Sequence, residues 1–173
     1  ALLEALEIDN YQAEILTDSL VDWLDEDSQL SGSNGAEDPG SESLPKPYLA
    51  ANSQLLEMSE LRMVRGYSAK VVNSLNSVAC VIPNETDLKI NINTLEQDQA
   101  AVLTGVTEGK LALADAMALL NNRPPQGYES DEELAELAEL SGVRSELEGE
   151  LPELTVSSEY FPLVAMIQWG EVE

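Results

Sequence analysis

The sequence contains no histidine, which removes the most common general base and a frequent metal ligand. No serine stands in a Gly-x-Ser-x-Gly nucleophile elbow. The single cysteine, Cys80, cannot form an internal disulfide, and its place in an apolar run predicts a buried, unreactive thiol. Carboxylates are so abundant that no pair stands out as a catalytic acid and base. We therefore expect a protein that is not an enzyme.

Basic residues are also scarce. Eight lysines and arginines oppose 33 acidic residues, which gives a formal net charge of −25. Such a field repels nucleic acid and anionic lipid, because both are bound mainly through Lys and Arg. Self-repulsion also opposes the compact state, and divalent cations or a basic partner would relieve it. The simpler alternative is an acidic surface that serves solubility or salt tolerance.

Long apolar runs are missing as well, since no stretch approaches the ~18 residues that span a bilayer. The 43% hydrophobic content of the 173 residues nevertheless allows one ordinary domain or two small ones. The first six residues already follow a helical pattern, with no capping residue ahead of them. We expect the chain to begin inside a helix, and a membrane-embedded first half of that helix to precede Ala1.

Apolar periodicity predicts one amphipathic helix over residues 1–24. Its apolar positions recur three, four or seven residues apart: Leu2, Leu6, Ala13, Leu16, Leu20 and Leu24. Residues 25–47 are rich in Gly, Ser and Pro, which predicts a loop. A loop of this length inside a compact domain usually serves a function.

The rest of the chain alternates between helical patterns and short β-like segments. Helices are expected over 58–76, 96–103 and 108–121, and another begins at Ser130 with acidic residues in its first turn. Residues 154–156 and 161–167 have β-like content. The order helix, loop, helical block and strands suggests a helical insertion between two pieces of an α+β domain.

The acidic loop (residues 25–38) is the strongest candidate site. It contains Asp25-Glu26-Asp27 and then Asn34-Gly35-Ala36-Glu37-Asp38. Hard cations such as Ca²⁺ bind several oxygen atoms on flexible loops, where glycine lets carboxylates turn toward one point. The spacing is not that of an EF-hand, so the prediction depends on the clustering alone. The alternative is an acidic loop that is simply solvated.

Two similar segments, Leu103-Thr104-Gly105-Val106 and Leu140-Ser141-Gly142-Val143, resemble the hairpins of helix-hairpin-helix modules. In those modules backbone N–H groups of a glycine turn bind phosphate, usually with cationic support. Acidic residues outnumber basic ones around both segments. We therefore interpret the pair as a structural scaffold and expect no nucleic acid, while a nucleic-acid binder remains the third hypothesis.

Several short motifs occur in a fixed order over about residues 20–145. They are Trp23-Leu24-Asp25-x-Asp27, Gly35-Ala36-Glu37-Asp38, Pro47-Tyr48-x-Ala50-Ala51-Asn52, Ser59-Glu60-Leu61-Arg62-x-Val64-Arg65-Gly66 and Ile90-Asn91-x-Asn93-Thr94. Together they resemble the general secretion pathway protein K family, the K-type minor pseudopilins of bacterial type II secretion.

The resemblance implies an α+β pseudopilin fold, in which a long N-terminal helix packs on a small antiparallel sheet. It also implies a large inserted all-α domain with helix-hairpin-helix-like turns. On this basis residues 1–52 and 151–173 would form a discontinuous pseudopilin domain, and residues 53–150 the insertion.

The same resemblance implies bound calcium, with ligands among Asp25, Asp27, Glu37 and Asp38. It implies a periplasmic domain, anchored to the bacterial inner membrane only through a preceding helix. Its position would be the tip of the pseudopilus, in a heterotrimer with the I-type and J-type minor pseudopilins. The H-type and major pseudopilins would be further neighbours in the fibre.

We expect a mechanical role from this combination. The apolar stripe of Leu6, Ala13, Leu16 and Leu20 would pack partly on its own sheet and partly on partner helices. Such a heterologous contact normally propagates a filament, and a bulky inserted domain would block addition above it. The subunit would then cap or initiate the fibre. The second hypothesis is a freestanding acidic calcium-binding module.

Overall fold

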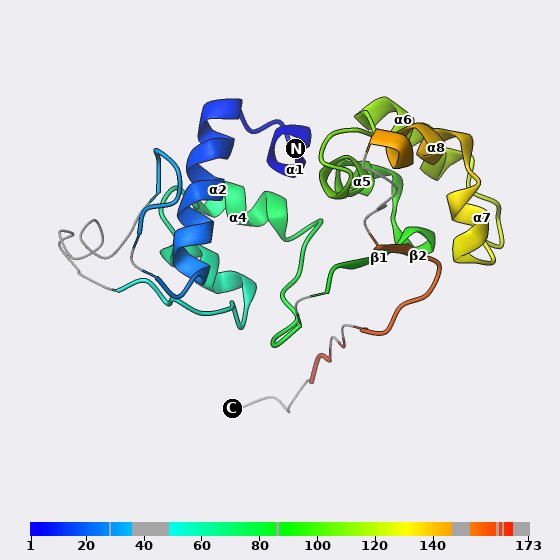
Figure 1. Ribbon diagram of the computed structural model, residues 1–173. Helices are drawn as coiled ribbons and strands as arrows, with labels where there is room; N and C mark the ends of the chain where they lie inside the picture. Colours follow the sequence, from blue (N-terminus) through cyan, green and yellow to red (C-terminus); the bar gives the residue numbers. More distant parts are fainter. Residues whose placement is uncertain are drawn as a thin grey trace.

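Figure 1 shows the computed structural model, in which short helices dominate and one small sheet is present. The structure describes residues 1–27, 29–35, 49–85, 87–146, 153–161, 163 and 165–167. This mixture agrees with the expected α+β class. In chain order the elements are α1 (Leu2–Ala5), α2 (Asn10–Leu24), the 3-10 helix η1 (Met58–Met63), α4 (Ala69–Leu75), β1 (Lys89–Asn91), η2 (Ile92–Thr94), η3 (Gln97–Gln99), α5 (Ala100–Val106), α6 (Leu113–Asn121), α7 (Asp131–Ala135), α8 (Ala138–Glu146) and β2 (Glu153–Thr155).

The single helix expected over residues 1–24 is broken between α1 and α2. Glu7 adopts the left-handed conformation, with φ at 63°. Its N–H donates to Glu4 O, and the N–H of Ile8 donates to Leu3 O, which is the Schellman pattern that ends a helix. Asp9 then caps α2, because its carboxylate accepts from the N–H of Gln12 at 3.0 Å. Two local caps therefore override the apolar periodicity.

The first core forms where α2 packs against η1 and α4. Its buried members are Leu16, Trp23, Leu61, Val64, Tyr67, Val71, Val72 and Leu75. The hydroxyl of Tyr67 donates to Leu16 O at 3.2 Å within this core. The helix expected over 58–76 is divided because Gly66 has φ at 87°, a conformation that glycine adopts at little cost.

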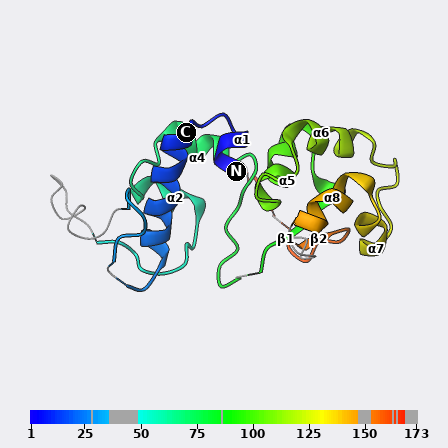
Figure 2. The same cartoon turned by 45° about the horizontal axis from the view of Figure 1, so that its top comes forward.

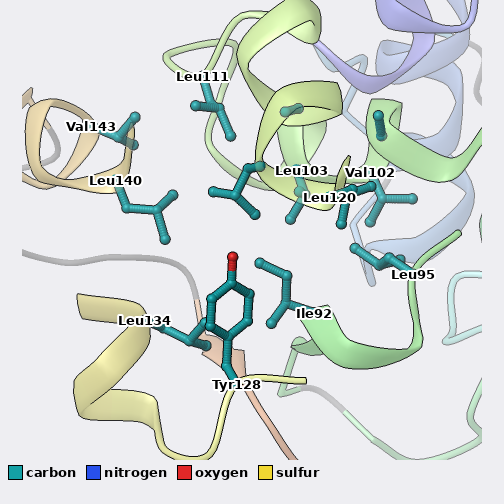
Figure 3. Close-up of a cluster of buried hydrophobic side chains, with 13 residues drawn as sticks. Ile92, Leu95, Val102, Leu103, Leu111, Leu120, Tyr128, Leu134, Leu140 and Val143 are labelled. Atoms are coloured by element: carbon teal, nitrogen blue, oxygen red, sulfur yellow. The ribbon is translucent and has the colours of Figure 1, made fainter. Parts of the chain in front are cut away.

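The second core collects apolar side chains from η2, α5, α6, α7 and α8, as Figure 3 shows. The ring of Tyr128 lies between Ile92 and Leu134. Asn93 fixes the backbone there: its amide nitrogen donates to Tyr128 O, and its amide oxygen accepts from Tyr128 N–H, both at 2.9 Å. Arg123 donates to Ile92 O and Leu95 O. The side chains that surround the core thus also satisfy backbone groups at its edge.

The sheet differs from the small antiparallel sheet that the resemblance implied. Within the described residues β1 and β2 pair in parallel, with Ile90 opposite Leu154. Parallel pairing requires a long crossover, and the four helices α5 to α8 supply it. The sheet therefore belongs to the second half of the chain and packs on the second core through Ile90 and Leu154.

The two segments expected as hairpin turns are helical. Gly105 lies in α5 and Gly142 lies in α8. The turn after α5 comes later, at Glu108 and Gly109, which both have positive φ. The expectation of turns at these glycines was wrong, because the left-handed residues stand after the Leu-Thr-Gly-Val segment rather than within it.

Hydrophobic packing divides the described chain differently from the expected boundaries. The first core reaches Leu75, and the second core begins at Ile92. The assignment of residues 53–150 to one inserted domain stays a prediction. Cys80 lies between the residues of the two cores in the chain and is exposed, so the expectation of a buried thiol was wrong: Val78 of its apolar run packs against the second core, whereas Cys80 does not.

Replacement of Tyr67 by phenylalanine should lower the free energy of unfolding by about 1 kcal/mol, because a buried hydrogen bond is lost. Burial raises the pKa of Tyr67 from its ordinary value of 10.0 to about 12. The neutral hydroxyl therefore stabilises the fold fully below pH 10.0, and this contribution is lost as the pH rises through 12. Urea unfolding of Tyr67→Phe should show a smaller decline over this range than the wild type. Tyr11→Phe, whose ring is 66% exposed, is the control, and equal effects of the two would contradict the assignment.

Candidate functional site

The C-terminal half of α2 carries several carboxylates that face the loop after it. Asp22 is fully buried, and its Oδ1 accepts from the N–H of Ser31 at 2.6 Å. Within the described residues, Asp22 Oδ2 and Asp25 Oδ1 are both buried without a hydrogen-bond partner. A buried carboxylate oxygen in this state is energetically unfavourable. A hydrogen-bond donor or a cation bound next to these oxygens would therefore stabilise the site.

The loop over residues 29–35 is held against α2 by its backbone. Asp18 Oδ2 accepts from the N–H of Asn34 at 3.2 Å, next to the bond between Ser31 and Asp22. Gly35 lies so close to Asp22 that an added Cβ would collide with the carboxylate and approach Ser31 O to 2.7 Å. The loop therefore approaches the helix at a distance that only glycine permits at this position.

Arg65 ties the same loop to the first core from the other side. Its guanidinium donates to Gly35 O at 3.1 Å. Arg65 follows η1, whose Leu61 is buried beside α2 in the first core. The loop is thus fixed between the carboxylates of α2 and a cation that follows η1.

The local charge is unfavourable without a cation. Partial burial raises the pKa of Asp25 above its usual value, and the negative charges of Asp27 and Asp22 raise it further. Asp25 also caps the C-terminal end of α2, where the helix dipole disfavours negative charge. The ionised carboxylates therefore destabilise this end of the fold, and a positive charge bound among them would be stabilising.

The four predicted calcium ligands divide between described and undescribed parts of the chain. Asp25 and Asp27 stand at the end of α2 and bring their carboxylates near one another. Glu37 and Asp38 lie outside the described residues. Over the part that the structure describes, no group of three or more His, Cys, Asp or Glu residues is placed to hold a metal ion. The calcium ligands stay a prediction.

The described residues nevertheless have the type of ligand atom that a hard cation binds. Their carboxylates offer oxygen atoms, which Ca²⁺ prefers as ligands. Asp22 adds an unsatisfied oxygen that the sequence analysis did not single out. The sequence could have pointed to Asp22 through its spacing, because residues three apart on a helix lie on the same face and Asp22 stands three residues before Asp25.

A pocket of about 540 Å³ lies beside this cluster. Glu26 lines it, together with Asn52, whose backbone has φ at 46°. The buried amide oxygen of Asn52 has no hydrogen-bond partner in the part of the chain that the structure describes. The other lining residues are Leu24, Ser53, Gln54, Leu56 and Asn84. The residues that line the pocket after the acidic loop, Asn52 to Gln54 and Leu56, therefore lie close to the end of α2.

The predicted partner residues mostly face the chain's own core. Ala13 is 7% exposed and Leu16 is completely buried, so these two offer no surface to a partner while the fold is intact. Leu6 and Leu20 are partly buried and pack against the first core. The exposed apolar side chains of α2 are instead Tyr11 and Val21. The described helices include none with the length and apolar content to cross a membrane.

Comparison with known proteins identifies the family. Two profiles, both described as protein K of the type II secretion system, match residues 1–84 and 90–157. The chain belongs to the type II secretion system protein K family. It is 37% identical to the protein K of Aeromonas hydrophila over 99% of this chain, and 34% identical to that of Pectobacterium carotovorum over 98%. In both cases it spans 51% of the relative's length.

A solved structure shows the same fold. The chain resembles a chain of the GspK-GspI-GspJ complex from the type 2 secretion system of enterotoxigenic Escherichia coli, with a TM-score of 0.75 and 31% identity. The match covers 91% of this chain and 54% of the other. The two protein K profiles meet between residues 84 and 90, within the segment that separates the two cores.

Gly35→Ala should detach the loop from α2 and destabilise the protein by about 1–3 kcal/mol, because the new methyl group overlaps a carboxylate and a carbonyl. Hydrogen exchange should accelerate at the amides of Ser31 and Asn34, which donate to Asp22 and Asp18. Ser33→Ala, at an exposed position of the same loop, is the control. Unchanged exchange at both amides in Gly35→Ala would show that the loop is not held in this way.

Proposed function

We propose that the chain is part of a K-type minor pseudopilin, a non-enzymatic assembly subunit at the tip of the type II secretion pseudopilus. Its location would be the periplasm, with an anchor in the inner membrane. Family membership supports this role. The observation that carries the choice of partners is the likeness to a chain of the GspK-GspI-GspJ complex. The I-type and J-type minor pseudopilins are the partners that we propose.

The exposed face of α2 is the surface that we assign to partner helices. Tyr11 and Val21 lie on it and are 66% and 44% exposed. In the proposed interface, Tyr11 and Val21 take the place of Ala13 and Leu16, because the latter two are buried within the chain itself. Glu14 and Thr17 are exposed between them, so the partner surface would need polar groups around an apolar centre. A heterologous contact of this type allows a fibre to grow in one direction.

Calcium is the cofactor that we propose for the acidic loop. The ion would be held by Asp25 and Asp27, with Glu37 and Asp38 as further ligands. Unpartnered oxygens at Asp22 and Asp25 support the site, as does the raised pKa of Asp25. A bound cation would neutralise this end of α2 and order the junction between the helix and its loop. A freestanding acidic calcium-binding module is the second candidate function, and the same two observations favour it.

The assembly role is tested by coexpression of the chain with I-type and J-type minor pseudopilins. A complex should form at micromolar concentration with calcium present. Tyr11→Asp, which introduces a charge into the exposed face of α2, should weaken association, since a buried charge without a partner is costly at an interface. Light scattering coupled to gel filtration measures the complex.

The matched control is Leu113→Asp, at an exposed position of α6 on the second half. If both variants associate equally well with the partners, the exposed face of α2 is not the interface. Failure of the wild-type chain to associate, with calcium binding intact, would favour the freestanding module.

The calcium site is tested by Asp25→Asn combined with Asp27→Asn. In chelator this variant should unfold at a higher temperature than the wild type, because two repelling charges are gone. Added calcium should stabilise the wild type by about 1.4 kcal/mol at ten times its Kd and the variant much less. The order of the two stabilities should therefore reverse when calcium is added.

The control variant, Asp98→Asn with Asp115→Asn, changes the net charge equally at two exposed positions in η3 and α6 of the second half. It should keep the full response to calcium. A wild-type chain whose melting temperature is the same in chelator and in calcium would contradict the proposal, and so would an equal response of the two double variants.

A further inference from the structure

Helix α1 lies between the two cores, as Figure 2 shows from above. Leu3, Leu6 and Ile8, in and just after α1, pack against the first core. The other side of α1 meets α5, which belongs to the second core. Among the described elements this is the most extensive contact between the two halves. We call residues 1–8 the α1 bridge.

Gly105 is the point of closest approach between the bridge and α5. A Cβ atom at this position would lie 2.6 Å from Leu2 Cβ and 3.1 Å from Leu2 Cα. Real atoms do not approach that closely, and the backbone of α1 would have to move. Gly105 lies inside a helix without a positive φ, so it is needed here for space and not for backbone freedom.

Gly142 provides an internal comparison. It follows the same Leu-x-Gly-Val pattern as Gly105 and also lies in a helix, α8. A Cβ atom at Gly142 would have no neighbour within 4 Å. The glycine of this motif is therefore packed closely against α1 in α5, whereas in α8 there is space for a Cβ atom.

The bend that turns α1 toward α5 has a local cost. Glu7 occupies the left-handed region, with φ at 63°, which L-residues other than glycine, asparagine and aspartate rarely adopt. A continuous helix through this point would remove the strain but would carry Leu2 away from Gly105. The local hydrogen bonds of Glu7 and Ile8 form the bend, and the packing of α1 on both halves stabilises it further.

We propose that the α1 bridge is a conformational device that fixes the orientation of the two halves. When Leu2 leaves Gly105, the halves rotate about residues 76–77, which connect Leu75 in the first core to Val78, packed against the second core. Undocking of α1 would thus change how the second half is presented relative to α2, independently of calcium and of partner binding.

The test measures the distance between the halves in the full 173-residue chain. Spin labels are placed on Glu14→Cys in α2 and Asn121→Cys in α6, both exposed positions, in a Cys80→Ser background. Pulsed electron paramagnetic resonance should give one narrow distance distribution. Gly105→Ala should broaden this distribution, whereas Gly142→Ala should leave it narrow. Both substitutions add the same methyl group to a helix.

Hydrogen exchange reports on the bridge itself. In Gly105→Ala the amides of Glu7 and Ile8, which close the end of α1, should exchange faster than in Gly142→Ala. If Gly105→Ala does not fold, Leu2→Ala decides the question, because it removes contacts of the bridge without altering the second core. A narrow distribution in Leu2→Ala, a broad one in the wild type, or identical behaviour of the two glycine variants would overturn the proposal.

Discussion

The burial of Asp22 beneath the loop at the end of α2 is the constraint on which the candidate site depends. A carboxylate without water must find donors nearby, and the loop supplies the backbone N–H of Ser31. This bond requires the close approach of Gly35, whose carbonyl then accepts from Arg65. The result is a rigid link between α2, the acidic loop and η1. Among the residues that the structure describes, one oxygen of Asp22 and one of Asp25 have no hydrogen-bond partner, at the place where the sequence concentrates negative charge.

The two cores explain how a short chain with this charge builds a fold. Each core is mainly aliphatic, although the first also contains Trp23. Each has one tyrosine whose backbone or hydroxyl is hydrogen-bonded to another element: Tyr67 to Leu16 in the first, and Tyr128 to Asn93 in the second. Among the described residues the members of both cores are uncharged, and Asp22 is the charged residue that is buried. Because the cores are separate, their relative orientation depends on the few contacts between them, and α1 provides the largest of these (Figure 1).

The sequence predicted local features well wherever a single signal acted. Ser130 begins α7 as expected and accepts from the N–H of Glu133. Of the two segments with β-like content, residues 154–155 lie in β2, whereas none of the described residues of 161–167 lies in a strand. The periodicity of residues 1–24 identified a helical segment but not its interruption, since the caps at Glu7 and Asp9 involve only a few residues. The ordered motifs led to the protein K family, which the comparisons confirm.

What the sequence determined by itself is the composition of the surface, the family and the clustering of carboxylates after the first helix. Tertiary structure alone decided which apolar residues are buried: Ala13 and Leu16 enter a core, whereas Cys80 does not. It also decided that β1 and β2 are parallel, and that a Cβ atom added at Gly105 would collide with Leu2 whereas one added at Gly142 would not collide. The physical reason is that these outcomes depend on contacts between residues far apart in the chain, and local propensity and spacing carry no information about such contacts.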